Sequence, residues 1–373
     1  MFPTLSELFY YLTGVHIALP LQTFGCVMVI AFAAAYWAYR SELKRKEGDG
    51  SIHPIERDII PGRLSRASIL LYASLAGWSV AKLIVAITHY RSFIGNPSRM
   101  LSSGVGNWWA GLATTLLVGG LMSYRRYQSR HQPTVRVVEH PYQMIDAMLW
   151  WCGLAGLYGA IFFHKLEHLP ELLHGTASWW SFDGMSYYGG LLPGIAVAMF
   201  MARRRRIPLI HMVDMGSPAM ILAYGIGRLG CHLSGDGDWG IVNTAPLPDG
   251  LNFLPSWAWA YAYPDSGQPV FPTSLYECIL GILFFALLWS LRRRITVPGR
   301  LFAIYCILNG AERLLIEQIR VNPVSVFGMT QAELISSGFI VTGLFFLFGA
   351  HIRRKEVTPS FASQAKGVTS LRR

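Results

Sequence analysis

The sequence has 373 residues, of which 52% are hydrophobic and only 14% are charged, and its formal net charge is +11. Soluble proteins carry about 25% charged residues, so this composition excludes an ordinary soluble protein. Apolar runs close to the spanning length of about 20 residues recur along the chain, which excludes an outer-membrane barrel with short alternating segments.

We therefore predict an all-α polytopic membrane protein of about nine transmembrane helices. The predicted spans are 17–39, 68–90, 105–124, 143–163, 186–202, 209–227, 273–291, 300–318 and 333–352. Basic clusters fall within 40–66, 125–136, 203–206, 292–300 and 353–355. With the N-terminus outside and the C-terminus inside, every basic cluster lies on the cytoplasmic side, as the positive-inside rule requires. The clusters then contact anionic membrane lipids, and no nucleic-acid partner is expected.

The chain divides into four predicted regions. Residues 1–40 hold the first span, 41–140 form a polar cytoplasmic linker with two further spans, 141–355 form the core, and 356–373 form a disordered cytoplasmic tail. The outer connection 164–180 is expected to carry a short amphipathic helix. The longest outer loop, 229–272, is rich in glycine, proline and aromatic residues, which favour the lipid headgroup layer. The five cysteines have no metal or redox spacing, and no cofactor or metal is expected.

The glycine-rich segment 223–240 is the most informative part of the sequence. Arg228 is expected to end the sixth span there, and a cation in hydrocarbon costs roughly 2.5–3.5 kcal/mol on insertion scales. Glycine-rich backbone at that depth is tolerated where it is buried in protein or lines a wet cavity. Together these features predict an anion site at the membrane surface, with backbone N–H groups of a glycine-rich turn as additional donors.

Several other polar groups are expected at the same depth, near the outer interface. They are Gln22, Thr23 and Phe24 at the start of the first span, Tyr187 and Tyr188 at the start of the fifth, Tyr276 and Glu277 in the first turn of the seventh, and Arg313, Glu317 and Arg320 on one face of the eighth. Each has a purely structural alternative, because an Arg–Glu pair is often a lock between helices and a tyrosine at a helix end is often an interfacial anchor.

These groups suit the handling of a phospholipid headgroup. Arg228 and Arg313 can clamp a phosphodiester in bidentate fashion and stabilise charge that grows on a phosphate leaving group. Glu277, Glu317 and Asp236 are candidates to orient the arginines. Asp236, His232 and Tyr188 are candidates to accept a proton from a nucleophile, and the residues alone do not choose among these three.

At these residues the chain resembles the prolipoprotein diacylglyceryl transferase family. The family's G-R-x-G-N-F-x-N-x-E block, which closes on a glycine, corresponds to 227–236 with Gly240 as the closing residue. The G-G-M-S-F-H-G-G-L stretch corresponds to 183–191, H-P-S-Q-L-Y-E to 271–277, F-R-x-x-x-E-x-x-R to 312–320, and W-Y-G to 23–25. The order and the membrane placement of these motifs agree over about 15–40 and 143–320.

The resemblance implies an enzyme that transfers the diacylglyceryl group of phosphatidylglycerol to the lipobox cysteine thiol of a prolipoprotein signal peptide. A thioether forms and glycerol phosphate leaves, which is the first step of lipoprotein maturation. It also implies a multi-pass protein of the bacterial inner membrane, with its active site toward the periplasmic leaflet. Arg228 and Arg313 carry over as headgroup binders and leaving-group stabilisers. The expected substrate-binding set is completed by Gly230, Gly240, Tyr276, Glu277, Glu317, Arg320, Gln22 and Phe24.

The sequence departs from the family pattern at four of these positions. Tyr188 replaces the histidine that is the usual proposed base, and a tyrosine is a poor base near neutrality. Cys231 replaces an asparagine, Asp236 a glutamate, and Phe24 a tyrosine. These changes keep two alternatives open: a non-catalytic phospholipid-binding homologue, and a small-molecule transporter with broken, glycine-rich helices.

Overall fold

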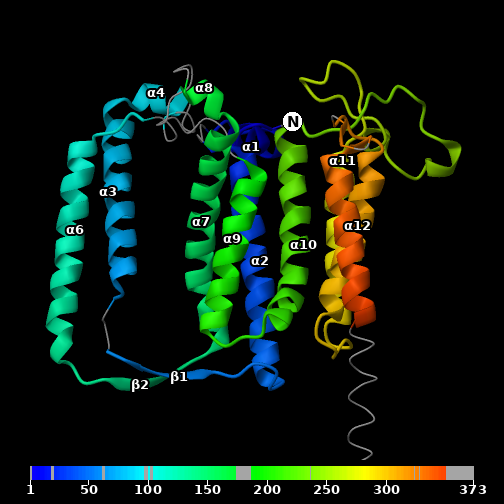
Figure 1. Ribbon diagram of the computed structural model, residues 1–373. Helices are drawn as coiled ribbons and strands as arrows, with labels where there is room; N and C mark the ends of the chain where they lie inside the picture. Colours follow the sequence, from blue (N-terminus) through cyan, green and yellow to red (C-terminus); the bar gives the residue numbers. More distant parts are fainter. Residues whose placement is uncertain are drawn as a thin grey trace, which may run out of the picture. The chain divides into compact units, whose positions relative to one another are not determined.

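The computed structural model (Figure 1) describes residues 2–17, 21–60, 64–95, 100, 104–173, 186–235, 237–322, 324–326 and 328–349. The chain separates into two compact units. The first unit comprises Met1–Leu43 and Ile207–Arg373, and the second unit comprises Lys44–Arg206.

The protein is a mostly helical, polytopic membrane protein. Among the described residues, six helical segments are long and apolar enough to cross a bilayer: Thr23–Gly48, Arg66–Thr88, Pro141–Glu167, Leu209–Ser234, Thr273–Leu291 and Gln331–Gly349. The other three predicted spans overlap helices α6 (Trp108–Gln128), α9 (Tyr187–Arg204) and α12 (Arg300–Glu317). Charged residues within α12, such as Glu312 and Arg313, lower its apolar character.

The first unit is built on α2 (Thr23–Gly48, as far as Leu43), α10 (Leu209–Ser234), α11 (Thr273–Leu291), α12 and the helix Gln331–Gly349. Helices α10, α11 and α12 contact one another pairwise. Gly225 and Gly281 let α10 and α11 approach closely, because a Cβ on Gly225 would lie 3.2 Å from the backbone of Gly281. A buried cluster holds the three helices together: Ile221, Leu288, Leu301, Tyr305 and Cys306.

A buried carboxylate fixes the start of α12. Asp214 on α10 accepts hydrogen bonds from the backbone N–H groups of Gly299 (2.6 Å) and Phe302 (2.8 Å). Gly299 itself has φ +89°, a conformation that glycine adopts without strain. Free N–H groups at a helix start need acceptors, and here the acceptor comes from a neighbouring helix.

The remaining elements of the first unit are short. They are α1 (Leu5–Thr13), the 3₁₀ turns η3 (Asp249–Leu251) and η4 (Ser256–Ala258), and the antiparallel strands β3 (Val324–Val326) and β4 (Met329–Thr330). Between α10 and α11 the chain is held by isolated β-bridges, which pair Val270 with both Val242 and Tyr261. This part of the first unit is therefore tied down by backbone pairing rather than by further helices.

The second unit contains two helical pairs that lie side by side, α3 (Arg66–Thr88) with α6, and α7 (Met144–Glu167) with α9 (Figure 1). Small residues line both contacts: a Cβ on Gly111 would lie 2.8 Å from the carbonyl oxygen of Gly77, and Gly159 faces Gly189. Short helices α4 (Tyr90–Gly95) and α8 (Leu169–Leu173) and the 3₁₀ turns η1 (Ser129–His131) and η2 (Pro141–Gln143) complete the unit.

Two strands form where the sequence predicted only a polar linker. β1 (Ile55–Ile59) pairs in antiparallel fashion with β2 (Val135–Glu139), with Ile55 opposite Glu139 and Ile59 opposite Val135. The strand partner lies far along the chain, so no local pattern could predict the pairing. The short helix expected within 164–180 is present as α8; residues 164–167 belong to the end of α7, and 174–180 lie outside the described residues.

The predicted ends of three helices are wrong. Helix α2 continues to Gly48, beyond the predicted end at residue 39. Helix α10 continues to Ser234, so Arg228 lies inside the helix instead of ending it. Helix α12 ends at Glu317, so Arg320 follows the helix instead of lying on its face. The start of α11 at Thr273, directly after Pro272, agrees with the prediction.

Candidate functional site

The candidate site of the first unit is centred on the carboxylate of Glu277. This side chain lies in the first turns of α11 and has no exposed surface. Its Oε1 pairs with Nη1 of Arg313 on α12. Its Oε2 lies 3.2 Å from Nε of Arg228 on α10 and 3.5 Å from Nη1 of Arg320. Three guanidinium groups from three parts of the chain thus meet at one buried carboxylate; we call Arg228, Arg313 and Arg320 the arginine cluster.

A second carboxylate, Asp238, links two members of the arginine cluster. Its two oxygens pair with Nη1 of Arg228 and with Nη2 of Arg320. The backbone reaches this position through Gly235 (φ 67°) and Gly237 (φ 90°), which adopt the left-handed region that glycine tolerates. The glycine-rich segment therefore turns after Gly235, beyond the end of α10, and delivers a carboxylate to the arginines.

Arg313 has a separate carboxylate partner on its own helix. Oε2 of Glu317 lies 3.4 Å from Nη2 of Arg313, one turn along α12. The other oxygen of Glu317 accepts hydrogen bonds from Nδ2 of Asn322 and Oγ1 of Thr330, each at 2.7 Å. Glu317 thus orients Arg313 and is itself held in place by two polar side chains.

An aromatic ring supports Arg228 from within α10. The guanidinium carbon of Arg228 lies 5.3 Å from the ring centre of Tyr224, close enough for a cation–π contact. The Tyr224 hydroxyl donates to Oε1 of Glu312 at 3.1 Å, which connects α10 to α12. The position of Arg228 is therefore defined by Glu277, Asp238 and Tyr224 together.

The formal charges of these six side chains cancel, because three arginines face the carboxylates of Glu277, Asp238 and Glu317. The side chains of Arg228 and Arg313 remain 19% and 21% exposed, so a ligand can reach them. Nε and Nη1 of Arg320 are buried and make no hydrogen bond within the part of the chain that the structure describes. A guanidinium offers five N–H donors, so the cluster keeps donors for an anion after its carboxylates are satisfied.

Gly240 brings the loop between α10 and α11 against the segment that carries Arg320. The two residues form an antiparallel β-bridge, and the Gly240 N–H donates to the carbonyl oxygen of Phe271 at 2.9 Å. A Cβ at position 240 would meet the Ile319 carbonyl oxygen, and it would lie 2.9 Å from Cγ2 of Thr273. Only glycine fits this position without displacing the backbone that carries Arg320.

Other residues predicted to bind substrate have different partners in the structure. Gly230 lies inside α10, where a Cβ would contact Phe24 at 3.3 Å, so its N–H belongs to the helix and not to a glycine-rich turn. Gln22 forms a β-bridge with Thr4. The Tyr276 hydroxyl donates to the carbonyl oxygen of Ala258 at 2.6 Å.

Of the three predicted proton acceptors, only His232 has side-chain contacts that the structure describes. His232 is buried, and its Nδ1 lies 2.9 Å from the hydroxyl of Tyr263, with the Tyr261 ring edge-on at 5.5 Å. Tyr188 lies in the first turn of α9, in the second unit. Asp236 lies outside the described residues.

The sequence analysis did not predict that Asp238 and Tyr224 contact Arg228. The available signal for Asp238 was the Asp-Gly-Asp run at 236–238, in which the choice between the two aspartates depends on the glycine turns around them. The signal for Tyr224 was its position one helical turn before Arg228, which predicts a shared face only if α10 includes Arg228.

Comparisons with known proteins show the family of the chain. The family model described as prolipoprotein diacylglyceryl transferase matches residues 105–349. The chain is similar to phosphatidylglycerol–prolipoprotein diacylglyceryl transferases of Streptococcus pyogenes, from serotype M5 (strain Manfredo) and serotype M49 (strain NZ131). In each case the identity is 28% over 197 residues, which is 52% of this chain and 71% of the relative. The residues matched by the family model include α10, α11 and α12, the helices that carry or precede the arginine cluster and Glu277.

Proposed function

Since the chain belongs to the prolipoprotein diacylglyceryl transferase family, we propose that it transfers the diacylglyceryl group of phosphatidylglycerol to the lipobox cysteine of a prolipoprotein. The substrate thiolate attacks the terminal glycerol CH2 of the diacylglyceryl group. A C–S bond forms, the C–O bond to the phosphate breaks, and glycerol phosphate leaves with the bonding electrons. The nucleophile belongs to the substrate, so none of the protein's cysteines has to react.

The arginine cluster is the observation that carries this proposal. Arg228 and Arg313 approach opposite oxygens of Glu277, and both side chains remain partly exposed. A phosphodiester bound there accepts hydrogen bonds from guanidinium groups that the carboxylates have already oriented. As the C–O bond breaks, charge increases on the phosphate, and fixed cations in a site of low dielectric stabilise that increase strongly.

The thiol proton needs an acceptor, and the candidates remain Tyr188, His232 and Asp236. His232 is engaged by Tyr263, which favours a structural role for that side chain. Asp238 is a further candidate for orienting the cluster, because it pairs with Arg228 and Arg320 at once. We assign Gly240, Glu277, Glu317 and Arg320 to the support of the lipid-binding arginines.

The proposal includes a topology and a compartment. We place the chain in a bacterial inner membrane with nine crossings, the N-terminus outside, and the arginine cluster toward the periplasmic leaflet. In this arrangement residues 41–140 are an addition that contributes two crossings, and an even number of crossings leaves the orientation of the core unchanged. Prolipoprotein signal peptides and phosphatidylglycerol then reach the site from the same leaflet.

The test is a transfer reaction with the full chain in vesicles that contain phosphatidylglycerol. A synthetic signal peptide with a lipobox cysteine is added, and its mass is followed together with the release of glycerol phosphate. We expect the peptide to gain one diacylglyceryl group, with glycerol phosphate released in equal amount. A peptide with serine in place of the lipobox cysteine, and vesicles of phosphatidylcholine alone, should give no product.

Other outcomes would point to the two alternatives. Phosphatidylglycerol that copurifies with the chain, without any lipidated peptide, would contradict the transferase and indicate a lipid-binding homologue. Solute flux across the same vesicles, again without product, would indicate a transporter. A strain depleted of its own transferase provides the cellular version of the test, with lipoprotein maturation read from gel mobility.

A further inference from the structure

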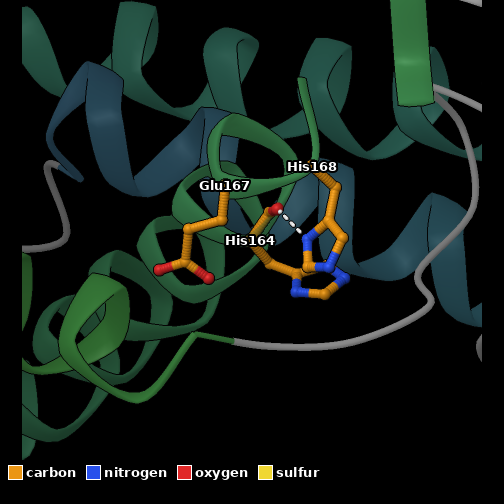
Figure 2. Close-up of side chains that lie close together, drawn as sticks. All are labelled: His164, Glu167 and His168. Carbon is orange, nitrogen blue, oxygen red and sulfur yellow. Dashed lines mark hydrogen bonds between the residues drawn. The ribbon is translucent and has the colours of Figure 1, made fainter. Parts of the chain in front are cut away.

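A second cluster of chemically capable side chains lies in the second unit, at the end of α7. His164 and Glu167 are in the last turn of this helix, and His168 follows directly as its C-terminal cap. The spacing i, i+3, i+4 places the three side chains on one face. Figure 2 shows the two imidazole rings close together, with Glu167 on the same end of the helix.

The distances suit a metal ion. Each residue offers one ligand atom, and the three atoms lie within 4.8 Å of one another. The ring centres of His164 and His168 are 4.3 Å apart. Metal–ligand distances of about 2.0–2.2 Å require a somewhat closer set, so small adjustments of the side-chain torsions accompany binding.

The orientation of two ligands is already fixed by outer hydrogen bonds. Nδ1 of His168 lies 3.0 Å from the carbonyl oxygen of His164; a carbonyl can only accept, so Nδ1 carries the proton and Nε2 keeps its lone pair for a metal. The Ser186 hydroxyl donates to Oε1 of Glu167 at 2.7 Å. Supporting hydrogen bonds of both kinds are typical of metal ligands, because they set the tautomer and the direction of each donor atom.

The position on the helix also favours a cation. The last carbonyl groups of α7 give its C-terminus a partial negative charge, which stabilises positive charge near the last turn. Two imidazoles and one carboxylate are the donors preferred by zinc and neighbouring transition metals, whereas magnesium and calcium prefer oxygen donors alone. Three protein ligands leave coordination positions for water.

We propose that His164, Glu167 and His168 bind one divalent transition-metal ion, of which Zn²⁺ is the best candidate. The site lies in a different unit from the arginine cluster, and the inference does not rest on the transferase activity. It predicts a property of the second unit, metal binding, that can be measured without any lipid or peptide substrate.

The experiment measures metal binding by the full chain in detergent, purified through a tag without histidine. Zn²⁺ bound per chain is determined by elemental analysis after dialysis, and the affinity by competition with a chromogenic chelator. We expect one Zn²⁺ per chain. Co²⁺ added in place of Zn²⁺ should give a visible ligand-field band that reports on its coordination.

Single variants His164→Ala, His168→Ala and Glu167→Gln are expected to weaken Zn²⁺ binding at least tenfold and to alter the Co²⁺ spectrum. Ser186→Ala, which removes an outer hydrogen bond, should weaken binding by about tenfold to one-hundredfold. The matched control is His53→Ala, because His53 is an exposed histidine elsewhere in the second unit. This control should bind Zn²⁺ as the unaltered chain does.

Two results would overturn the proposal. One is a chain that binds no Zn²⁺ above the level of a detergent blank while its thermal melting is normal. The other is a His164→Ala, His168→Ala double variant that still binds Zn²⁺ with unchanged affinity and an unchanged Co²⁺ spectrum. If a variant melts early, Glu167→Gln provides a test that keeps side-chain size nearly constant.

Discussion

Nε of Arg228 lies 3.2 Å from Oε2 of Glu277, a side chain that has no exposed surface. The same carboxylate pairs with Arg313 through its other oxygen. Such a carboxylate either locks the helices together or orients the arginines for ligand binding. Variants of Glu277 and Arg228 separate the contribution of this contact to stability from its contribution to ligand binding.

Glu277→Gln should destabilise the protein strongly, because it leaves buried guanidinium groups without their shared counter-charge. Loss of one partner of a buried ion pair costs about 3–5 kcal/mol, so Tm should fall by several degrees. Thermal melting followed by tryptophan fluorescence in detergent measures the change. Glu56→Gln is the control, because Glu56 is an exposed partner of Arg136 and its removal should cost less than about 1 kcal/mol. Equal melting of the two variants would contradict the central role of Glu277.

Arg228→Ala should reduce the rate of diacylglyceryl transfer by about 100-fold to 1,000-fold, the usual effect of removing one donor that stabilises a developing anion. Arg228→Lys should recover only part of the rate, because lysine keeps the charge and loses the planar fork that binds phosphate in bidentate fashion. The measurement is the initial rate of peptide lipidation in phosphatidylglycerol vesicles. A lysine variant as active as the unaltered chain would show that charge alone is needed.

Asp238→Asn and Asp236→Asn distinguish the carboxylate found in the structure from the one chosen by sequence. Asp238 pairs with both Arg228 and Arg320, so its amide variant should lower the transfer rate by at least tenfold and weaken retention of phosphatidylglycerol. Both quantities are measured side by side, by lipidation rate and by native mass spectrometry. A larger loss in Asp236→Asn would return the supporting role to Asp236.

The sequence predicted the elements whose signals are local. The seventh span begins at Thr273 because Pro272 and the apolar run after it mark a helix start, and α11 has these limits. Glu277 followed from that start, since it lies in the first turns. The extension of α10 beyond Arg228 was missed, because the helix contains polar side chains whose partners, Asp238 for Arg228 and Tyr263 for His232, come from other segments.

The pairing of two strands and the place of Arg320 were also not predicted, because both depend on contacts between distant segments. The pairing of β1 with β2 joins residues far apart in the sequence, and the mixed polar pattern of Ile55–Ile59 gives no alternation to detect. The place of Arg320 was misjudged because α12 ends at Glu317, where the chain turns to form a β-bridge with Gly240. Each correction depends on a contact that only the folded chain brings together.

Gly240→Ala should distort the loop that carries Arg320. The added Cβ would lie 2.9 Å from Cγ2 of Thr273 and 3.0 Å from Cβ of Phe271, and it would also meet the carbonyl oxygen of Ile319. Overpacking of this kind costs about 1–3 kcal/mol, and the transfer rate should fall with it. Gly250→Ala is the matched control, because no atom of the described residues beyond its two chain neighbours lies within 4 Å of the added Cβ there. Loss of activity in both variants would mean that loop composition, and not the close contact at Gly240, is what matters.

Tyr188→Phe tests whether the Tyr188 hydroxyl accepts the proton of the substrate thiol. If the Tyr188 hydroxyl takes part in turnover, its removal should lower kcat by at least tenfold and change the affinity for phosphatidylglycerol little, since the ring remains. The measurement separates kcat from KM for the peptide and adds lipid retention as an independent readout. Tyr187→Phe is the control, because it removes a neighbouring hydroxyl from the same turn of α9. Full activity of Tyr188→Phe would exclude this hydroxyl. His232→Gln would then be the next variant, with a smaller effect expected because His232 already lies 2.9 Å from the Tyr263 hydroxyl.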